Sequence, residues 1–320
     1  MSTLIASEPS RFAQDVAAGF SAIGNKKIAP RYFYDDLGSI LFEAITLLPE
    51  YGLTRADERL LRVHAGDIAR EVDRLRIVAE LGSGSGKKTL PILSSLLGKN
   101  SQLSYCPIDV SAAALAACER EIGSLCEVKP VCSDWVQGVA EIASEREKNL
   151  PLLLLFLGSS IGNLDREGIP HFLRDLRSHL LPGDFFLLGA DLVKDIDIMI
   201  TAYDDPTGVT AAFNLNVLSR MNRELQADFD LRAFVHEVRW NSEERRIEMH
   251  LLSCRDQDVF IGALEASYHF DAGETIWTES SHKFTLEELS QFAQQSGFAS
   301  VATWVDKEWA FAETLWQVTE

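Results

Sequence analysis

A glycine-rich loop is the part of this sequence best suited to holding a small ligand. Residues 80–89 read ELGSGSGKKT and follow directly on the apolar segment RIVAEL (76–81). A Walker loop has four residues between its first glycine and its Gly-Lys pair, whereas only three separate Gly82 from Gly86, and Lys88 stands where serine or threonine should follow. The dinucleotide pattern GxGxxG would require glycine at position 87, which is lysine. The pattern ExGxGxG fits, with a plain glycine turn as the alternative.

The loop and two acids that follow it together predict a cofactor containing a nucleoside. Glycines let the backbone turn sharply and let a ligand approach it closely. With no pyrophosphate to cradle, the loop can pack on the methionine chain and ribose of S-adenosylmethionine. Asp109 ends the next apolar segment, where a carboxylate can accept from both ribose hydroxyls. Asp134 ends the third, where it could accept from the adenine amino group with Trp135 beside the ring. Either acid alone could instead cap a helix.

The net charge and the end of the fourth apolar segment both argue against a nucleic-acid substrate. That segment ends in GSSIGN (158–163) and lacks the Asn/Asp-Pro-Pro-aromatic motif common in methyltransferases that modify DNA bases. The chain has 30 Lys and Arg against 48 Asp and Glu, a formal charge of −18. A surface this acidic repels phosphate backbones. We therefore expect a small-molecule substrate and no nucleic-acid partner.

Alternating strands and helices from about residue 60 position the loop and the acids. Strands are predicted at 76–81, 103–110, 127–134, 150–158 and 184–191, and helices at 89–97, 111–123 and 166–180. Residues 150–158 are apolar on both faces, which predicts a central strand. The order predicts a doubly wound parallel sheet of the α/β class, with helices on both faces and the ligand at the carboxyl ends of the strands.

The flanking parts of the chain show a different pattern. Helical spacing occurs at 10–24, 39–47 and 209–226, and the segments 233–241, 245–253 and 258–270 alternate like antiparallel strands. A helix at 285–297 and two final strands follow. We expect a cofactor domain formed by 60–195 plus 285–320, and a smaller α+β substrate-binding domain formed by 1–59 plus 196–284.

Cysteine, histidine and hydropathy patterns limit the remaining classes. The five cysteines form no CxxC pair and the histidines show no HxxxH or HExxH spacing, so we expect neither a disulfide framework nor a metal site. The longest apolar run, 150–157, is far shorter than the roughly 20 residues that span a bilayer. The N-terminal MSTLIASEPS lacks the basic start and apolar core of a signal peptide. We expect a cytoplasmic monomer with no membrane partner.

Longer segments resemble one family, the histidine N-alpha-methyltransferases of ergothioneine biosynthesis. The matching segments are RYFYDDLGSILFEAITLLPEY, ELGSGSGKKT, PIDVS, FLGSSIGN, ADLVKD, AYDDPTGVTAAFNLNVLSRMNRELQADFDL, WNSEERRIEM and TESSHKF. They occur in order through nearly the whole chain. The resemblance implies a Rossmann-like class I methyltransferase fold, with S-adenosylmethionine as cofactor and S-adenosylhomocysteine as product. It also implies three methyl transfers to the α-nitrogen of histidine, giving hercynine.

The resemblance further implies a substrate site made of Tyr34, Tyr51, Asn163, Tyr203, Met249, Glu279 and Ser281. Asn163 and Tyr203 should hold the substrate carboxylate, and Tyr34 should lie near the α-amine as the catalytic residue. Tyr51, Glu279 and Ser281 should bind the imidazole, in a pocket that Met249 lines. Tyr51 is followed by Gly52-Leu53, where members of the family carry a second tyrosine and a proline, so this part of the pocket wall departs from the family pattern.

The expected cofactor residues lie around the glycine loop and the strand ends, and the resemblance implies Gly82, Lys88, Asp109 and Asp134 among them. The expected set is Gly82, Ser83, Gly84, Lys88, Asp109, Asp134, Trp135 and Gly158.

Three other functions remain compatible with these residues. One is the same N-methylation of tryptophan or a prenylated tryptophan. Glu279 disfavours it, because indole has one donor and no charge and would leave a buried acid poorly paired. An NAD-linked oxidoreductase would bind a dinucleotide rather than S-adenosylhomocysteine. A scaffold without catalysis would bind the cofactor and methylate no amino acid.

Overall fold

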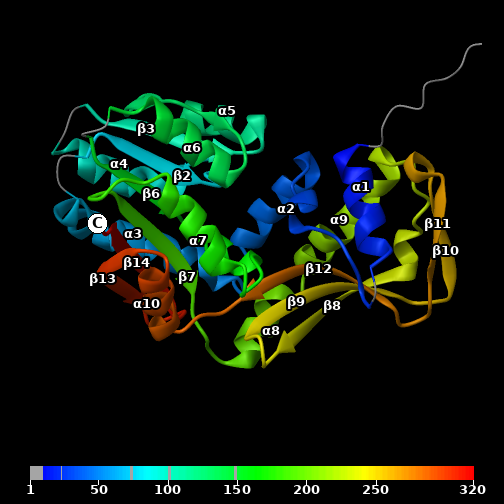
Figure 1. The fold of residues 1–320 in the computed structure, drawn as a ribbon. Coiled ribbons are helices and arrows are strands. Elements are labelled where there is room, and N and C mark those ends of the chain that lie inside the picture. Colours follow the sequence, from blue (N-terminus) through cyan, green and yellow to red (C-terminus); the bar gives the residue numbers. More distant parts are fainter. Residues whose placement is uncertain (1–9, 23, 73–74, 100–101, 148–149) are drawn as a thin grey trace, which may run out of the picture. The chain divides into compact units, whose positions relative to one another are not determined.

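The computed structural model of the chain describes residues 10–22, 24–72, 75–99, 102–147 and 150–320. The N-terminal segment considered for a signal peptide lies mostly in residues 1–9, outside the described residues. The chain divides into two units (Figure 1). Unit 1 consists of residues 1–52 and 195–281, and unit 2 consists of residues 53–194 and 282–320.

Unit 2 contains an eight-stranded, mostly parallel sheet. Its strands are β2 (Ile77–Leu81), β3 (Ser104–Asp109), β4 (Glu127–Val128), β5 (Val131–Cys132), β6 (Leu152–Phe156), β7 (Phe185–Asp191), β13 (Phe298–Asp306) and β14 (Phe311–Val318). The order is β13-β14-β7-β6-β2-β3-β4, and β5 also pairs with β3. β14 runs antiparallel to both of its neighbours, whereas the pairs among β2 to β7 are parallel. The predicted doubly wound sheet with β6 at its centre is confirmed.

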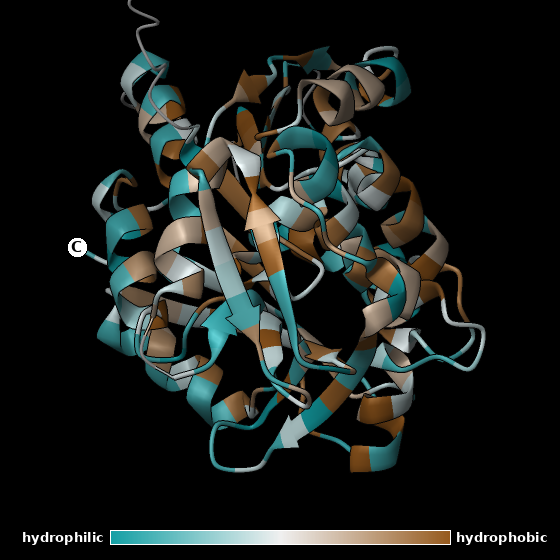
Figure 2. Ribbon diagram, turned by 90° about the vertical axis from the view of Figure 1, so that its right-hand side faces the viewer, coloured by the Kyte–Doolittle hydropathy of each residue, from teal (hydrophilic) through white to brown (hydrophobic). Residues whose placement is uncertain are grey.

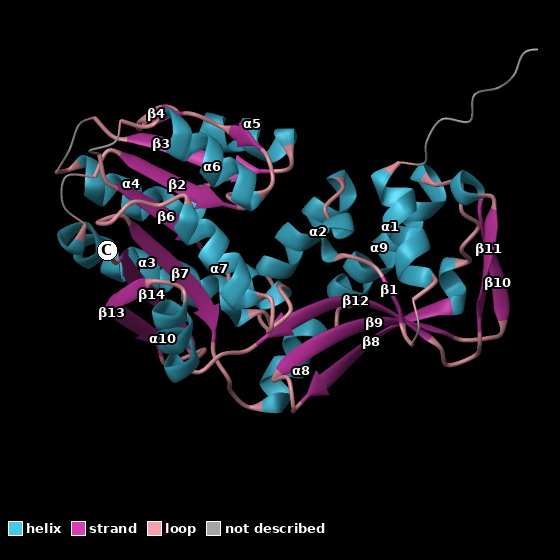
Figure 3. Cartoon of the chain, viewed as in Figure 1, coloured by secondary structure: helices cyan, strands magenta, loops and turns pink. Residues whose placement is uncertain are grey.

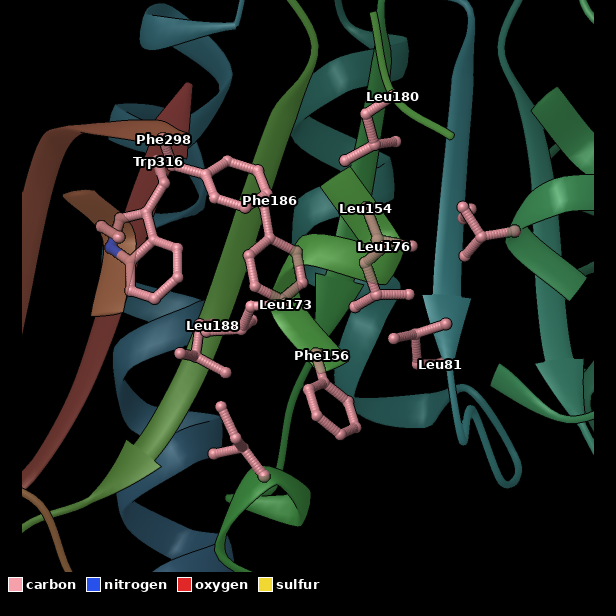
Figure 4. Packing of buried hydrophobic residues seen from close by; sticks show 14 of the residues in the cluster. Leu81, Leu154, Phe156, Leu173, Leu176, Leu180, Phe186, Leu188, Phe298 and Trp316 are labelled. Carbon is pink, nitrogen blue, oxygen red and sulfur yellow. The ribbon is translucent and has the colours of Figure 1, made fainter. Parts of the chain in front are cut away.

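Helices cover both faces of this sheet because successive side chains of each buried strand point to opposite sides. They are α3 (Gly52–Glu71), α4 (Leu90–Leu97), α5 (Ala112–Ile122), α6 (Trp135–Glu145), α7 (Ile169–Ser178) and α10 (Leu286–Gln295), with short 3-10 helices η2 (Lys87–Thr89) and η3 (Ser160–Asn163). Leu154 belongs to the core beneath α6, α7 and α10, which Figure 4 shows, and its neighbour Leu153 belongs to the core beneath α3, α4 and α5. The helices carry hydrophobic residues beside hydrophilic ones, as expected where one face is buried (Figure 2).

Unit 1 contains a four-stranded sheet and a separate hairpin (Figure 3). The sheet has the order β1-β12-β9-β8, formed by β1 (Lys26–Lys27), β8 (Phe234–Asn241), β9 (Arg246–Ser253) and β12 (Thr275–His282). The hairpin is formed by β10 (Gln257–Ile261) and β11 (Ala266–Phe270). The helices are α1 (Arg11–Phe20), α2 (Asp36–Thr46), α8 (Ile196–Tyr203) and α9 (Val209–Glu224), with 3-10 helices η1 (Pro30–Phe33), η4 (Leu231–Ala233) and η5 (Gly262–Leu264).

Several predicted elements need correction. The segment 258–270 is not one strand, because η5 and the left-handed Glu265 (φ 48°) turn the chain back on itself. The segment 127–134 is two short strands separated by Lys129 and Pro130, and proline has no N–H to donate to a sheet. The expected helix at 10–24 ends at Phe20, and Ile23 lies outside the described residues.

The structure also contains helices that the sequence patterns did not predict, namely α3, α6 and α8. The predicted domain boundary between residues 59 and 60 falls inside α3. Along the chain, unit 1 ends at Gly52 and unit 2 begins at Leu53. The other two unit boundaries lie at 194/195 and 281/282. A helix is one hydrogen-bonded body, and all of α3 after Gly52 belongs to unit 2.

Candidate functional site

The glycine loop lies at the carboxyl end of β2 and has a left-handed backbone at three positions. The φ angles of Gly82, Gly84 and Gly86 are 62°, 54° and 72°, a region that side chains with a Cβ rarely adopt. The Gly82 and Ser83 amides donate to the Ile108 carbonyl over 2.8 and 3.4 Å. A Cβ added to Gly84 would meet nothing within 4 Å, so the loop has open space beside it. This geometry fits close approach of a ligand to the backbone.

The acid that precedes the loop, Glu80, has a structural role in this arrangement. Its side chain is buried, and it accepts hydrogen bonds from the Thr89 hydroxyl (2.5 Å) and the Tyr105 hydroxyl. Burial raises the pKa of Glu80, which the two hydroxyl hydrogen bonds oppose. Glu80 therefore joins both ends of the loop and the neighbouring strand β3.

Asp109 lies beside the loop, as expected for an acid that ends the neighbouring strand. Its Oδ2 accepts from the Gly84 amide over 3.2 Å, and its Oδ1 accepts from the Ser111 amide over 2.8 Å. The first contact fixes the loop, and the second fixes the start of α5. A ligand held by Gly84 would therefore lie close to this carboxylate.

Asp134 is the N-cap of α6, the alternative that the sequence left open. Its Oδ1 accepts from the Gln137 amide over 3.1 Å. The next residue, Trp135, packs edge-on against Phe156, with ring centroids 4.8 Å apart. A Cβ on Gly82 would lie 3.5 Å from the Trp135 indole nitrogen, so the indole borders the glycine loop. The cap leaves a cofactor role for Asp134 open, because a carboxylate has further acceptor sites.

Lys88 and Gly158 meet at a residue that the sequence patterns did not single out, Asp57 of α3. One oxygen of the buried Asp57 carboxylate accepts from Lys88 Nζ over 2.9 Å and from the Gly158 amide over 3.0 Å. Burial acts to lower the pKa of Lys88, but the charge and hydrogen bond of Asp57 oppose it and the pKa is raised. Asp57 stands in a helix with no chemical motif, so no sequence signal could have identified it.

Asn163 belongs to unit 2, in the 3-10 helix η3 after β6. The residue that begins this turn, Ser159, has a φ of 58°, and its hydroxyl accepts from the Asp191 amide over 2.9 Å. A Cβ on Gly162 would lie 2.9 Å from the His282 carbonyl oxygen, so only glycine fits there. The remaining predicted substrate residues all lie in unit 1.

In unit 1, an aromatic pair and a hydroxyl contact bring three of these residues together. The Tyr203 hydroxyl lies 2.7 Å from Ser281 Oγ. Tyr51 packs edge-on against Tyr203, with ring centroids 5.9 Å apart. All three side chains are buried. Glu279 is two residues before Ser281 on β12 and is half-buried, which places both on one side of the strand.

Tyr34 and Met249 have different surroundings. Tyr34 is 38% exposed and packs edge-on against Phe42 and Phe213, with centroids 5.7 and 5.9 Å away. Met249 is buried in β9, and its carbonyl accepts from the Thr278 hydroxyl over 2.9 Å, which joins β9 to β12. The contacts within unit 1 therefore place Tyr34 on an aromatic cluster and Met249 in the sheet.

A partly buried histidine supports the Tyr203 backbone. His236 Nε2 lies 2.8 Å from the Tyr203 carbonyl, so this nitrogen is the donor and Nδ1 is the acceptor. Nδ1 accepts from the Asn214 amide over 2.8 Å. Burial lowers the pKa of His236, which favours this neutral form. Neither His236 nor Asn214 was predicted, because a lone histidine on a strand has no distinctive spacing.

No group of three or more His, Cys, Asp or Glu residues suited to a metal ion occurs among the described residues. Of the helices that the structure describes, none has the length and apolar character needed to cross a membrane.

Comparison with known proteins gives the family. Residues 12–318 match the family model described as histidine-specific, S-adenosylmethionine-dependent methyltransferase. The chain is 42% identical over 294 residues to a histidine N-alpha-methyltransferase of Mycobacterium tuberculosis, covering 91% of this chain and 90% of the relative. It is 41% identical over 305 residues to the protein of the same name from Mycolicibacterium smegmatis, covering 94% and 93%. An L-tryptophan methyltransferase of Psilocybe serbica is 25% identical over 317 residues, covering 89% and 86%. The chain therefore belongs, as its sequence predicted, to the histidine-specific methyltransferases that depend on S-adenosylmethionine.

Proposed function

We propose that this protein transfers three methyl groups from S-adenosylmethionine to the α-nitrogen of L-histidine, giving hercynine for ergothioneine biosynthesis. Membership of the family makes the chain an S-adenosylmethionine-dependent methyltransferase that acts on histidine. The single observation that carries the proposal is the family match over residues 12–318, which includes both units. The number of methyl groups and the roles of individual residues are our inferences.

The proposed cofactor site uses the carboxyl edge of the unit 2 sheet. Gly82, Ser83 and Gly84 offer backbone at a place with open space beside Gly84. Asp109 would accept from the ribose hydroxyls, and Lys88 would supply a positive charge. The adenine amino group would donate to Asp134, and the adenine ring would lie beside Trp135. The proposed cofactor site also includes Gly158. These groups suit S-adenosylmethionine. An acid can accept from its two ribose hydroxyls, a cation can pair with its carboxylate, and the open backbone leaves room for its methionine chain.

The proposed substrate residues provide groups of the right chemistry for an amino acid. Asn163 and the Tyr203 hydroxyl would hold the carboxylate. Glu279 would accept the imidazole N–H and stabilise a protonated ring, while Ser281 would serve the other ring nitrogen. Tyr51 and Met249 would border the ring. Tyr34 would lie near the α-amine.

The chemistry needs a neutral amine and correct alignment. When bound, S-adenosylmethionine supplies an electrophilic methyl group on a sulfonium. The nitrogen lone pair forms the N–C bond as the C–S bond breaks, and the C–S electron pair stays on sulfur. The α-amino group of a free amino acid is mostly protonated at neutral pH, so one proton must leave before each attack. Tyr34 would take a position near that nitrogen, and alignment alone contributes about 7–11 kcal/mol in favourable cases.

Mass spectrometry of histidine incubated with the protein and S-adenosylmethionine tests the proposal. We expect mono-, di- and trimethylated histidine in succession, with one S-adenosylhomocysteine formed for each methyl group. Parallel reactions with tryptophan address the main rival. Faster turnover of tryptophan, or a product that stops at one methyl group, would overturn the proposed substrate or the proposed number of transfers.

The location and assembly expected from the sequence are also proposals. We infer a cytoplasmic monomer from the five cysteines without a CxxC pair and from the strongly acidic composition. Light scattering coupled to size-exclusion chromatography tests the monomer, and a mass of twice 35.6 kDa would contradict it.

A further inference from the structure

We propose that Asp57 and Glu313 form a buried carboxyl pair that shares one proton and positions Lys88 for the cofactor. The positioning part of this inference rests on the proposed cofactor site. Asp57, Lys88 and Glu313 all belong to unit 2, in α3, η2 and β14. Asp57 and Glu313 would be positioning residues, since neither is assigned a contact with substrate or cofactor.

Asp57 connects two parts of the proposed cofactor site through one oxygen. Its Oδ2 accepts from Lys88 Nζ over 2.9 Å and from the Gly158 amide over 3.0 Å. The Asp57 side chain is 0% exposed, whereas that of Lys88 is 31% exposed. An ammonium has three donors, so Lys88 can hold Asp57 with one and direct another to a ligand. The contact therefore fixes both the Lys88 side chain and the turn after β6.

Glu313 occupies space that a glycine leaves open. It is paired across the sheet with Gly189 of β7, and a Cβ on Gly189 would lie 2.8 Å from Glu313 Oε1. The Glu313 side chain is buried. No hydrogen-bond donor reaches either Glu313 oxygen or Asp57 Oδ1 within the part of the chain that the structure describes. Two carboxylates with no donor between them are costly to bury, and one shared proton removes that deficit.

Two acids and one lysine face Glu313, namely Asp57 of α3, Glu80 of β2 and Lys88 of η2, and the two acids favour its protonated form. Burial raises the pKa of Glu313 well above its usual range, with further increases from Asp57 and Glu80, and Lys88 opposes them. A neutral Glu313 can donate to Asp57, which leaves the Asp57 charge directed at Lys88.

A double-mutant cycle for binding S-adenosylhomocysteine tests the positioning role. By isothermal titration, we expect Asp57→Asn to weaken binding at least tenfold and Lys88→Met to weaken it similarly. Asp57→Asn keeps a side-chain carbonyl oxygen that can accept from the Gly158 amide. If the rest of its effect acts through Lys88, the double variant should bind no more weakly than Lys88→Met alone, within about twofold. Independent, multiplying losses would overturn the positioning role, because a general structural defect would add to the loss of Lys88.

Glu313→Gln is the matched variant for the shared proton. Its amide N–H can replace the acid O–H toward Asp57, so we expect cofactor binding within about twofold of the unsubstituted protein. Glu313→Leu keeps the bulk but cannot donate, and we expect it to bind more weakly than Glu313→Gln. Equal binding by the two variants, or a loss in Glu313→Gln as large as that in Asp57→Asn, would overturn the pair.

The pH dependence of unfolding tests the pair without any cofactor. A raised pKa in the folded protein means that the folded state binds more protons than the unfolded state. The Glu313 contribution to stability is therefore fully present below the pKa of the unfolded chain and is lost as pH rises toward the raised value. Urea unfolding between pH 5 and 9 should show a smaller fall in stability for Glu313→Gln than for the unsubstituted protein, and parallel curves would overturn the shared proton. If no S-adenosylhomocysteine binds at all, the proposed function and the positioning role fail, and this measurement still decides whether the pair exists.

Discussion

The Tyr203 hydroxyl lies 2.7 Å from Ser281 Oγ, which joins α8 to β12 inside unit 1. These residues are proposed to bind different parts of the substrate, the carboxylate and the imidazole. Because their hydroxyls contact each other, changing one should reorient the other. We expect Tyr203→Phe to raise the KM for histidine, by the equivalent of about 0.5–1.5 kcal/mol for one hydrogen bond. Steady-state kinetics of Tyr203→Phe, Ser281→Ala and the double variant would show less than additive losses, and strict additivity would contradict the coupling.

Glu279 is expected to select histidine. Glu279→Ala should weaken histidine use far more than cofactor binding, because the carboxylate is proposed to pair with the imidazole. Kinetics with histidine and titration with S-adenosylhomocysteine measure the two effects separately. Glu243→Ala is a matched control, since Glu243 is an exposed glutamate in the turn before β9. Equal losses of histidine use and cofactor affinity would argue against the placement of Glu279.

Asp109 is expected to act on the cofactor. Asp109→Ala should reduce the affinity for S-adenosylhomocysteine, because it removes the proposed ribose acceptor and the 3.2 Å contact with the Gly84 amide. Asp175→Ala, at a partly exposed position on α7, controls for loss of an acidic residue. The idea fails if Asp109→Ala binds S-adenosylhomocysteine as tightly as the control.

Two glycines of the same loop should differ in their tolerance of alanine. Both Gly84 and Gly86 have positive φ, which costs an alanine about 1–2 kcal/mol. A Cβ on Gly86 would also lie 2.5 Å from Ile122 Cδ1 and 2.7 Å from Cys118 Sγ, whereas Gly84 has nothing within 4 Å. We expect Gly86→Ala to lower the free energy of unfolding by about 1–3 kcal/mol more than Gly84→Ala. Urea unfolding measures both, and equal losses would contradict the contacts at Gly86.

His236 should make stability depend on pH on the acid side. Burial lowers the pKa of His236, so the folded state binds fewer protons than the unfolded state. Its contribution is fully present above the ordinary histidine pKa and is lost as pH falls toward the lowered value. His236→Gln should therefore reduce the loss of stability between pH 7 and 5. His250, whose pKa is also lowered by burial, should leave part of that loss in place. Unchanged curves would show that His236 is not held neutral in the fold.

Some features of the fold were predictable because local chemistry alone determines them. The run at 150–158 is apolar at every position up to Leu157, and only a central strand buries both of its faces. The loop after β2 was predictable because its glycines occupy positions with positive φ. Long family segments in both units also identified the cofactor and the substrate class before any geometry was known.

Other features arose only from tertiary packing. Asp57 and Glu313 are 0% and 1% exposed, in α3 and β14, at opposite ends of the sequence of unit 2. Neither has a neighbour in sequence that signals its role, because their proximity depends on how a helix packs over distant strands. The hairpin at 257–270 was not predicted, because apolar and polar side chains keep alternating through the turn between its two strands. Sequence patterns thus determined which residue types line the strand ends, whereas packing decided which buried charges and hydroxyls face each other.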